Sequence, residues 1–99
     1  MKKSIVVIAR VKAKSGKKEE LKKELLKLIE PSRKDDGCIN YDLHNSEDEP
    51  GQFMFHETWR DKEALTKHLA TPHLRKFIEI SDNLIEGQIN ISLWNKIEE

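Results

Sequence analysis

The sequence predicts an α+β domain whose elements follow the order strand–helix–strand–strand–helix–strand. Apolar residues alternate with period two in four short stretches, and they recur at helical spacing in the regions between them. Charged residues and hydrophobic residues each make up 36% of the 99 residues. A chain this short with so few apolar residues has a thin core. We therefore expect one domain over residues 1–99 that completes its core as a homodimer.

The first strand is predicted over Ile5–Lys12, with apolar residues on both faces in its first half, as in a central strand covered on both sides. Ser15 is the predicted N-cap of the helix that follows. The inner stripe of that helix consists of Leu21, Leu25, Leu28 and Ile29, widened by Leu26. The helix kinks or closes near Pro31, and Asp35-Asp36-Gly37 forms the turn out of it.

The next two strands, Cys38–Asn45 and Phe53–Trp59, form a predicted hairpin around the acidic loop Ser46–Gly51. Alternate residues of each strand share a face. One face carries Ile39, Tyr41, Leu43, Phe53, Phe55, Glu57 and Trp59. The opposite face carries Asn40, Asp42, His44, Met54, His56 and Thr58. We expect the Tyr41 side to meet the helices, and the side with His44 and His56 to meet a partner or solvent.

A helical region follows, with a break at Thr71-Pro72. Asp61 is the predicted cap of its first part, with Ala64, Leu65, His68 and Leu69 on the inner face. Thr71 is the predicted N-cap of its second part, and Pro72 its first helical residue. The inner stripe of that part is Leu74, Phe77, Ile78, Ser81, Leu84 and Ile85. Gly87 ends the helix, and the last strand spans Ile89–Trp94.

This order is the ferredoxin-like βαββαβ pattern, with an antiparallel sheet covered by helices on one face. The other sheet face carries several apolar residues, so a homodimer with the two sheets facing each other is the simplest closure. Lys+Arg and Asp+Glu balance at 18 each, so no nucleic-acid partner is expected. The apolar run Ile5–Ala9 is too short for a signal peptide or a membrane span, so we expect a cytoplasmic protein without membrane contact. Cys38 is the single cysteine and is expected to be a small buried hydrophobe.

Several stretches occur in an order and spacing that resemble a known family. They are Glu30-Pro31-Ser32-Arg33, Gly37–His44, Phe53–Trp59, Ala64-Leu65 with His68-Leu69, and Thr71-Pro72-His73. Together they resemble the antibiotic biosynthesis monooxygenase family, in its small quinol-monooxygenase-like branch, from Val6 to about Trp94. The resemblance implies a dimeric α+β barrel that takes a small-molecule substrate. It implies, for different members, cofactor-free oxygenation of quinols or polyphenols, haem degradation, or isomerisation of a phosphorylated dione in autoinducer-2 catabolism.

The chain departs from this family pattern in two ways. Where the haem-degrading branch has an Asn, a Trp and a His, this sequence has Ala9, His68 and Ile78, so haem degradation is disfavoured. The polyketide monooxygenases carry an Asn where this sequence has Phe55, which weakens the oxygen-activating interpretation. Glu57, His68 and Thr71-Pro72-His73 fit the isomerase branch as well.

His68 and Glu57 are the candidate catalytic residues. His68 follows Ala64 and Leu65 on the inner helix face, and imidazole exchanges a proton near neutral pH, so His68 is either a general base or a satisfied core histidine. Glu57 lies among three aromatic residues, where an unpaired carboxylate is costly to bury. A Glu57–His68 pair would meet that need. The alternative for Glu57 is a strand-edge carboxylate paired with Lys or Arg.

The candidate substrate-binding residues are Tyr41, Trp59, Phe53, Phe55 and His73. Tyr41 and Trp59 either wall a flat aromatic substrate or pack in the core, and the two phenylalanines pack or line the pocket. His73 stands at a helix start, suited to an anion or a substrate phosphate, or simply as an exposed capping residue. No two histidines share a ligand spacing on one element, so no metal site is predicted. The resemblance to a family with cofactor-free members implies that no other cofactor is needed.

Three functions remain open at this point. The first is a cofactor-independent monooxygenase of a quinol or related phenol with His68 as base. The second is an isomerase of a small phosphorylated hydroxy-ketone, in which His68 and Glu57 move a proton and His73 or Arg75 holds the anion. The third is a non-enzymatic small-molecule binding module, in which His68 contributes to affinity alone.

Overall fold

The computed structural model describes residues 3–98, and its elements follow the predicted order with the second helical region divided in two. The strands are β1 (Ile5–Lys12), β2 (Cys38–Asn45), β3 (Gln52–Trp59) and β4 (Asn90–Trp94). The helices are α1 (Lys18–Arg33), α2 (Lys62–Leu69) and α3 (Pro72–Leu84). The α+β, ferredoxin-like class is thereby confirmed. Residues 1, 2 and 99 of the predicted domain lie outside the described part.

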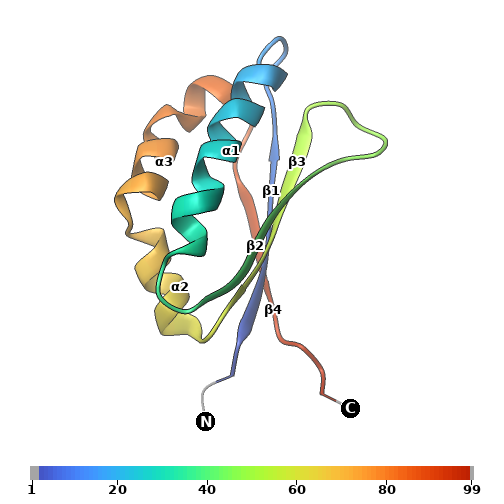
Figure 1. Cartoon of the computed structure of the whole chain (residues 1–99). Coiled ribbons are helices and arrows are strands. Elements are labelled where there is room, and N and C mark those ends of the chain that lie inside the picture. Colours follow the sequence, from blue (N-terminus) through green and yellow to red (C-terminus); the bar gives the residue numbers. More distant parts are fainter. Residues whose placement is uncertain (1–2, 99) are drawn as a thin grey trace.

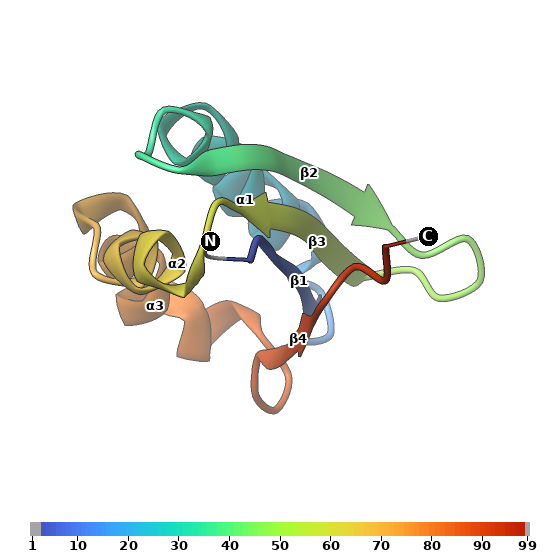
Figure 2. The ribbon, with the colours of Figure 1, turned by 90° about the horizontal axis from the view of Figure 1, so that it is seen from below.

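The four strands form an antiparallel sheet in the order β2-β3-β1-β4. The three helices all lie on one side of this sheet (Figure 1). The view from below shows the same separation, with the loop between β2 and β3 projecting away from the helices (Figure 2). The register pairs Val7 with Glu57 and with Leu93, so these three side chains share the face that meets the helices.

The core lies between the helices and that sheet face. Leu21, Leu25 and Leu28 of α1 are each at most 4% exposed, as the predicted inner stripe requires. On β3, Phe53, Phe55, Glu57 and Trp59 are buried while the residues between them are half-buried. Burying one leucine side chain contributes roughly 1.5–3 kcal/mol relative to leaving it exposed. The predicted assignment of sheet faces is therefore confirmed for β3.

The predictions for the helix ends are wrong in part for α1 and confirmed in position for α2 and α3. Lys17, not Ser15, precedes α1, and its side chain makes no capping hydrogen bond. Pro31 lies inside α1, which continues to Arg33. Asp61 does cap α2, because its carboxylate accepts a 2.8 Å hydrogen bond from the backbone N–H of Ala64. Thr71 occupies the N-cap position of α3, but its side chain makes no capping hydrogen bond.

Four apolar residues are more exposed than the sequence pattern predicts. A register shift between Cys38 and Asn40 turns Ile39 away from Tyr41 and leaves it 63% exposed. Leu26, Leu69 and Ile78 are each about half exposed, although their spacing placed them in the inner helical stripes. Within residues 3–98, no helix has the length and apolar character needed to cross a bilayer.

Candidate active site

A cavity of about 310 Å³ lies between the helices and the sheet. It is lined by side chains from all four strands and all three helices. Its lining is aliphatic or aromatic except for three residues with polar groups, Tyr41, Glu57 and His68. This volume is at the lower end of the range for small-molecule sites. An apolar cavity with a few convergent polar groups is the usual form of such a site.

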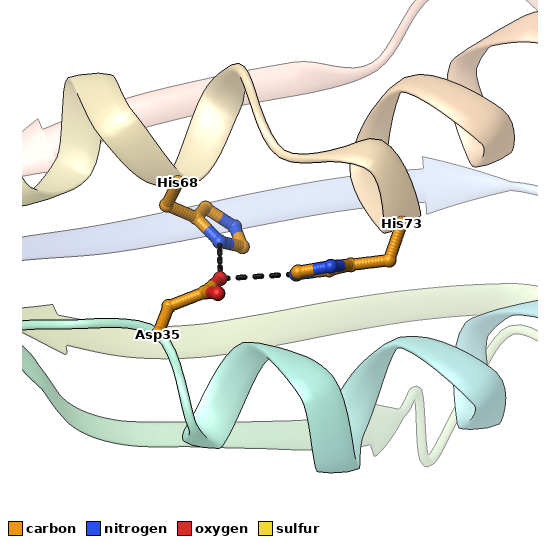
Figure 3. A group of neighbouring side chains, drawn as sticks. All are labelled: Asp35, His68 and His73. Atoms are coloured by element: carbon orange, nitrogen blue, oxygen red, sulfur yellow. Dashed lines mark hydrogen bonds and ion pairs between the residues drawn. The ribbon is translucent and has the colours of Figure 1, made fainter.

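His68 lies in the last turn of α2, and its side chain is only 2% exposed. Its Nδ1 is 2.9 Å from Oδ2 of Asp35 (Figure 3). An ionised carboxylate only accepts hydrogen bonds, so this contact places a hydrogen on Nδ1 and leaves Nε2 of the neutral ring as the basic nitrogen. The ring stacks at 31° on Trp59, with centroids 4.4 Å apart. Trp59 and Asp35 together fix the plane of the imidazole.

The pKa of His68 is lowered from its usual value, because burial disfavours the charged ring. The hydrogen bond to Asp35 opposes this shift and only partly offsets it. The imidazole is therefore neutral near pH 7. A neutral, oriented imidazole at a cavity wall has the properties of a general base.

Asp35 lies in the turn between α1 and β2 and also contacts His73. His73 Nε2 is 3.0 Å from the same Oδ2 of Asp35 (Figure 3). The Thr71 hydroxyl donates to the backbone oxygen of His68 at 2.7 Å and lies 3.2 Å from His73 Nε2. These bonds tie the turn after α1 to the break between α2 and α3. They hold Asp35 in the place where it orients His68.

Glu57 has a different partner from the predicted one. Its Oε1 accepts a 2.9 Å hydrogen bond from Nε1 of Trp59, two residues along the same strand face. The predicted Glu57–His68 pair is therefore wrong, because each residue is satisfied by a neighbour that the fold brings closer. Glu57 is only 4% exposed, and this burial raises the pKa of its carboxyl to about 7. Both Glu57 and His68 still line the cavity.

The other predicted site residues divide into two groups. Tyr41 and Phe55 line the cavity, and burial raises the pKa of the Tyr41 phenol. Trp59 and Phe53 are buried but are not part of the lining; Trp59 lies behind His68. His73 also lies outside this cavity and borders a separate surface hollow beside Lys76. The substrate-binding roles of all five residues stay predictions.

Asp35 was missed by the sequence reasoning. It appears in the sequence only as part of the turn Asp35-Asp36-Gly37, without the periodicity that marks an inner face. It lies 33 positions before His68, so only the fold brings the two together. His44 is exposed and His56 lies on the sheet face opposite the helices, where its ring contacts Asn40.

The Asp35, His68 and His73 cluster also bears on metal binding. One ligand atom from each residue lies within 4.8 Å of the other two. Two imidazoles and one carboxylate form a donor set that suits first-row divalent metals. Each of these donor groups already takes part in a hydrogen bond within the cluster. A metal ion would have to replace those bonds, and the metal-free site stays a prediction.

A family model described as antibiotic biosynthesis monooxygenase matches residues 4–80, which is most of the chain. The protein therefore belongs to the antibiotic biosynthesis monooxygenase family. This membership supports a small-molecule monooxygenase type of function.

Individual proteins agree with this assignment. The chain is 40% identical over 95% of its length to the uncharacterized protein sll1783 of Synechocystis, and spans 64% of that protein's length. It is 31% identical to a Bacillus subtilis protein named putative monooxygenase YcnE, with 88% of this chain and 92% of YcnE covered. The crystal structure of PA3566 from Pseudomonas aeruginosa matches with a TM-score of 0.93 and 33% identity, covering 99% of this chain and 98% of that one.

Proposed function

We propose that the protein is a cofactor-independent monooxygenase that acts on a quinol or related phenol, with His68 as the base. The observation that carries the proposal is the 2.9 Å hydrogen bond from His68 to Asp35 at the wall of an apolar cavity. It leaves Nε2 as the proton acceptor and stabilises the imidazolium that forms when the ring takes a proton. Family membership supports the monooxygenase class.

The chemistry starts with transfer of the substrate's hydroxyl proton to Nε2 of His68. The resulting anion is electron-rich and passes an electron to molecular oxygen directly. One oxygen atom becomes a new hydroxyl on a ring carbon that carried hydrogen, and the other leaves as water with the proton held by His68. Overall, a quinol and O₂ give a hydroxyquinone and water, and the substrate supplies all four electrons. The apolar lining of the cavity disfavours water beside the reactive anion.

Glu57 serves the second substrate oxygen in this proposal. Because the pKa of Glu57 is about 7, much of the carboxyl is protonated near neutral pH and can donate a hydrogen bond. Such a bond stabilises negative charge that spreads across the ring to the oxygen opposite His68. An ionised Glu57 would repel that charge. We therefore expect the rate of oxygenation to fall at low pH as His68 takes a proton, and at high pH as Glu57 loses one.

The isomerase alternative receives less support. Among residues 3–98, none that lines the cavity is a lysine or arginine, and His73 lies outside it. A substrate phosphate would be buried beside Glu57 without a cationic partner, which is costly. The binding-module alternative shares the cavity, so only an activity measurement separates it from the enzyme.

Oxygen uptake with a panel of quinols tests the proposal. We expect uptake with at least one quinol, and loss of uptake in His68→Gln, which keeps a polar side chain of similar length. His56→Gln is the matched control, since His56 lies on the opposite sheet face. Dialysis against EDTA should leave the rate unchanged. Ligand-induced thermal stabilisation without oxygen uptake would favour the binding module, and unchanged uptake in His68→Gln would remove the base.

We also propose that the protein is a homodimer whose two sheets face each other. In the part of the chain that the structure describes, the helices all lie on one side of the sheet (Figure 1). Val6 and Ile8 of β1 point to the other side, because Val7 between them shares the helix-facing side with Glu57. Trp94 of β4 pairs with Val6 in the register and is 56% exposed on the same face. A second copy would bury these side chains and enlarge a thin core.

A further inference from the structure

The cavity has one polar end. Tyr41 pairs with Glu57 across β2 and β3, so their side chains leave neighbouring points of the same sheet face. The ring of Tyr41 lies edge-on to that of His68, with centroids 5.4 Å apart. The three polar side chains of the lining therefore gather in one place. The rest of the lining offers only carbon and favours an apolar body.

The cavity also has an apolar mouth. Leu69, Ile78, Ile91 and Leu93 line the cavity, and each is 46–54% exposed. Ile91 and Leu93 lie on β4, an edge strand, on the face that meets the helices, opposite Ala9 and Val7. Half-exposed single hydrophobic residues are ordinary, but four that border one cavity mark its opening. We call these four residues the apolar collar.

Charge sets a further limit on the ligand. Of the residues that line the cavity within 3–98, Glu57 and His68 are the ionisable ones apart from the Tyr41 phenol, and none is a lysine or arginine. A ligand carboxylate or phosphate would lose its hydration without a cationic partner. The cavity therefore selects uncharged molecules.

We propose that the substrate is an uncharged phenol or quinol that carries an aliphatic substituent. Its hydroxyl end lies beside His68 and Glu57, and its substituent leaves through the apolar collar. The inference rests on the proposed function for the position of the hydroxyl. Beyond the proposed function, it states that the substrate carries an aliphatic substituent and that anionic molecules are excluded. A second copy of the chain is the competing occupant of the collar.

Binding of simple phenols under nitrogen tests this without turnover, because the proposed reaction requires oxygen. We would titrate the protein by calorimetry with 4-methylphenol, 4-propylphenol and 4-hexylphenol, and with 3-(4-hydroxyphenyl)propanoate as the anionic match for the propyl compound. A methylene that leaves water contributes about 0.8 kcal/mol, or about fourfold in affinity, so the two added in the propyl compound should tighten binding about tenfold or more. The anionic compound should bind at least about tenfold more weakly than 4-propylphenol, since its carboxylate is desolvated without a partner.

Variants locate the effect. Ile78→Ser and Leu93→Ser should flatten the dependence on chain length, so that 4-propylphenol loses more affinity than 4-methylphenol in each variant. Ile39→Ser is the matched control, because Ile39 is 63% exposed and lies outside the cavity lining. Circular dichroism and thermal unfolding verify that each variant is folded. The two collar residues come from different elements, so one variant is informative if the other misfolds. If both misfold, the wild-type series is the deciding measurement.

Each outcome decides one question. The inference is overturned if wild type binds all three alkylphenols with equal affinity, or if it binds the anionic compound as tightly as 4-propylphenol. It is also overturned if both collar variants fold and keep the full dependence of affinity on chain length. Oxygen uptake that occurs together with a flat series would overturn the inference and keep the proposed function. A steep series without oxygen uptake from any quinol would keep the ligand class and overturn the proposed function.

Discussion

Two adjacent aspartates have unrelated partners, and this difference defines the role of Asp35. Asp35 accepts hydrogen bonds from His68 and His73, whereas Asp36 pairs with Arg60 on the surface. Asn at position 35 keeps the shape of the side chain but lacks its charge, and its amide can turn an N–H toward Nδ1. We expect Asp35→Asn to lower kcat by about 10²–10⁴, in line with the loss of an orienting carboxylate elsewhere.

Asp36→Asn is the matched control for this prediction and should leave kcat within about twofold, because an exposed ion pair contributes little. Oxygen-uptake kinetics supply kcat and KM for both variants. A fall in kcat at constant KM in Asp35→Asn, together with a changed pH profile below neutrality, indicates positioning of His68. Equal losses in the two variants would contradict the assignment.

Glu57 couples the stability of the fold to pH. Its pKa is about 7 in the folded protein and about 4.5 otherwise, so between these values the folded state binds more proton than the unfolded state. The protonated carboxyl therefore contributes its full stabilisation below about pH 4.5, and this contribution is lost as the pH rises through 7. The free energy of unfolding falls by at most about 3 kcal/mol over this range. Glu57→Gln removes this loss, because Gln is neutral throughout and still accepts from Trp59.

Urea unfolding at pH 5 and pH 8 measures this effect. We subtract the free energy of unfolding of wild type from that of Glu57→Gln at each pH. We expect this difference to be more positive at pH 8 than at pH 5. The comparison with wild type cancels the contribution of His68 to the pH dependence of stability. The lowered pKa of His68 acts in the opposite direction to the raised pKa of Glu57. The same pH dependence in both proteins would show that Glu57 keeps an ordinary pKa.

Residue patterns predicted the site only in part. Alternation along β3 placed Glu57 and Phe55 on the face that meets the helices, and helical spacing placed His68 on its inner face. The partner of His68 depends on a contact that no local pattern encodes, whereas Glu57 and its partner Trp59 share one strand face. Trp59 is two residues from Glu57 on the same strand, but Asp35 comes from the turn after α1, which only the folded chain brings near His68.

At the scale of elements, the turn that carries Asp35 depends on Gly37. Gly37 has φ +84°, and a Cβ there would lie 2.5 Å from Cβ of Ala64 in α2. Alanine at position 37 would thus meet both an unfavourable backbone conformation and a clash with a buried helix. We expect Gly37→Ala to lower the free energy of unfolding by about 2–5 kcal/mol.

Gly16→Ala separates these two causes. Gly16 has a similar φ of +78°, but nothing lies within 4 Å of its added Cβ. The loss there should be only the backbone contribution, about 1–2 kcal/mol. Denaturant unfolding of both variants gives the difference. Equal losses would mean that α2 shifts freely away from the turn, and then the geometry of Asp35 and His68 would be less rigid than inferred.

Element existence and order followed from the sequence because periodicity reports burial directly. The errors arose where tertiary structure overrides the local pattern. Ile39 has the spacing of an inner residue, but the register shift in β2 turns it outward. Ile78 belongs to the apolar stripe of α3, yet half of it is exposed, because it borders the cavity mouth rather than the closed core.

At the scale of the whole molecule, the helices of residues 3–98 cover one face of the sheet and leave the other face uncovered. The uncovered face includes Ile8, flanked in the register by His56 of β3 and Ser92 of β4, near the middle of the sheet. If two sheets face each other, Asp at position 8 would bury an unpaired charge in the interface. We expect Ile8→Asp to weaken dimerisation by at least about a hundredfold, since leaving one buried charge unpaired costs several kcal/mol.

Leu26→Asp is the matched control, because Leu26 is 50% exposed on α1, on the other side of the molecule. Sedimentation equilibrium of the three proteins gives their dissociation constants, and circular dichroism shows whether each is folded. We expect a dimer for wild type and Leu26→Asp, and a folded monomer for Ile8→Asp at the same concentration. The sheet-to-sheet arrangement fails if wild type is monomeric throughout, or if Leu26→Asp dissociates the dimer while Ile8→Asp does not, since the contact would then lie on the helical side.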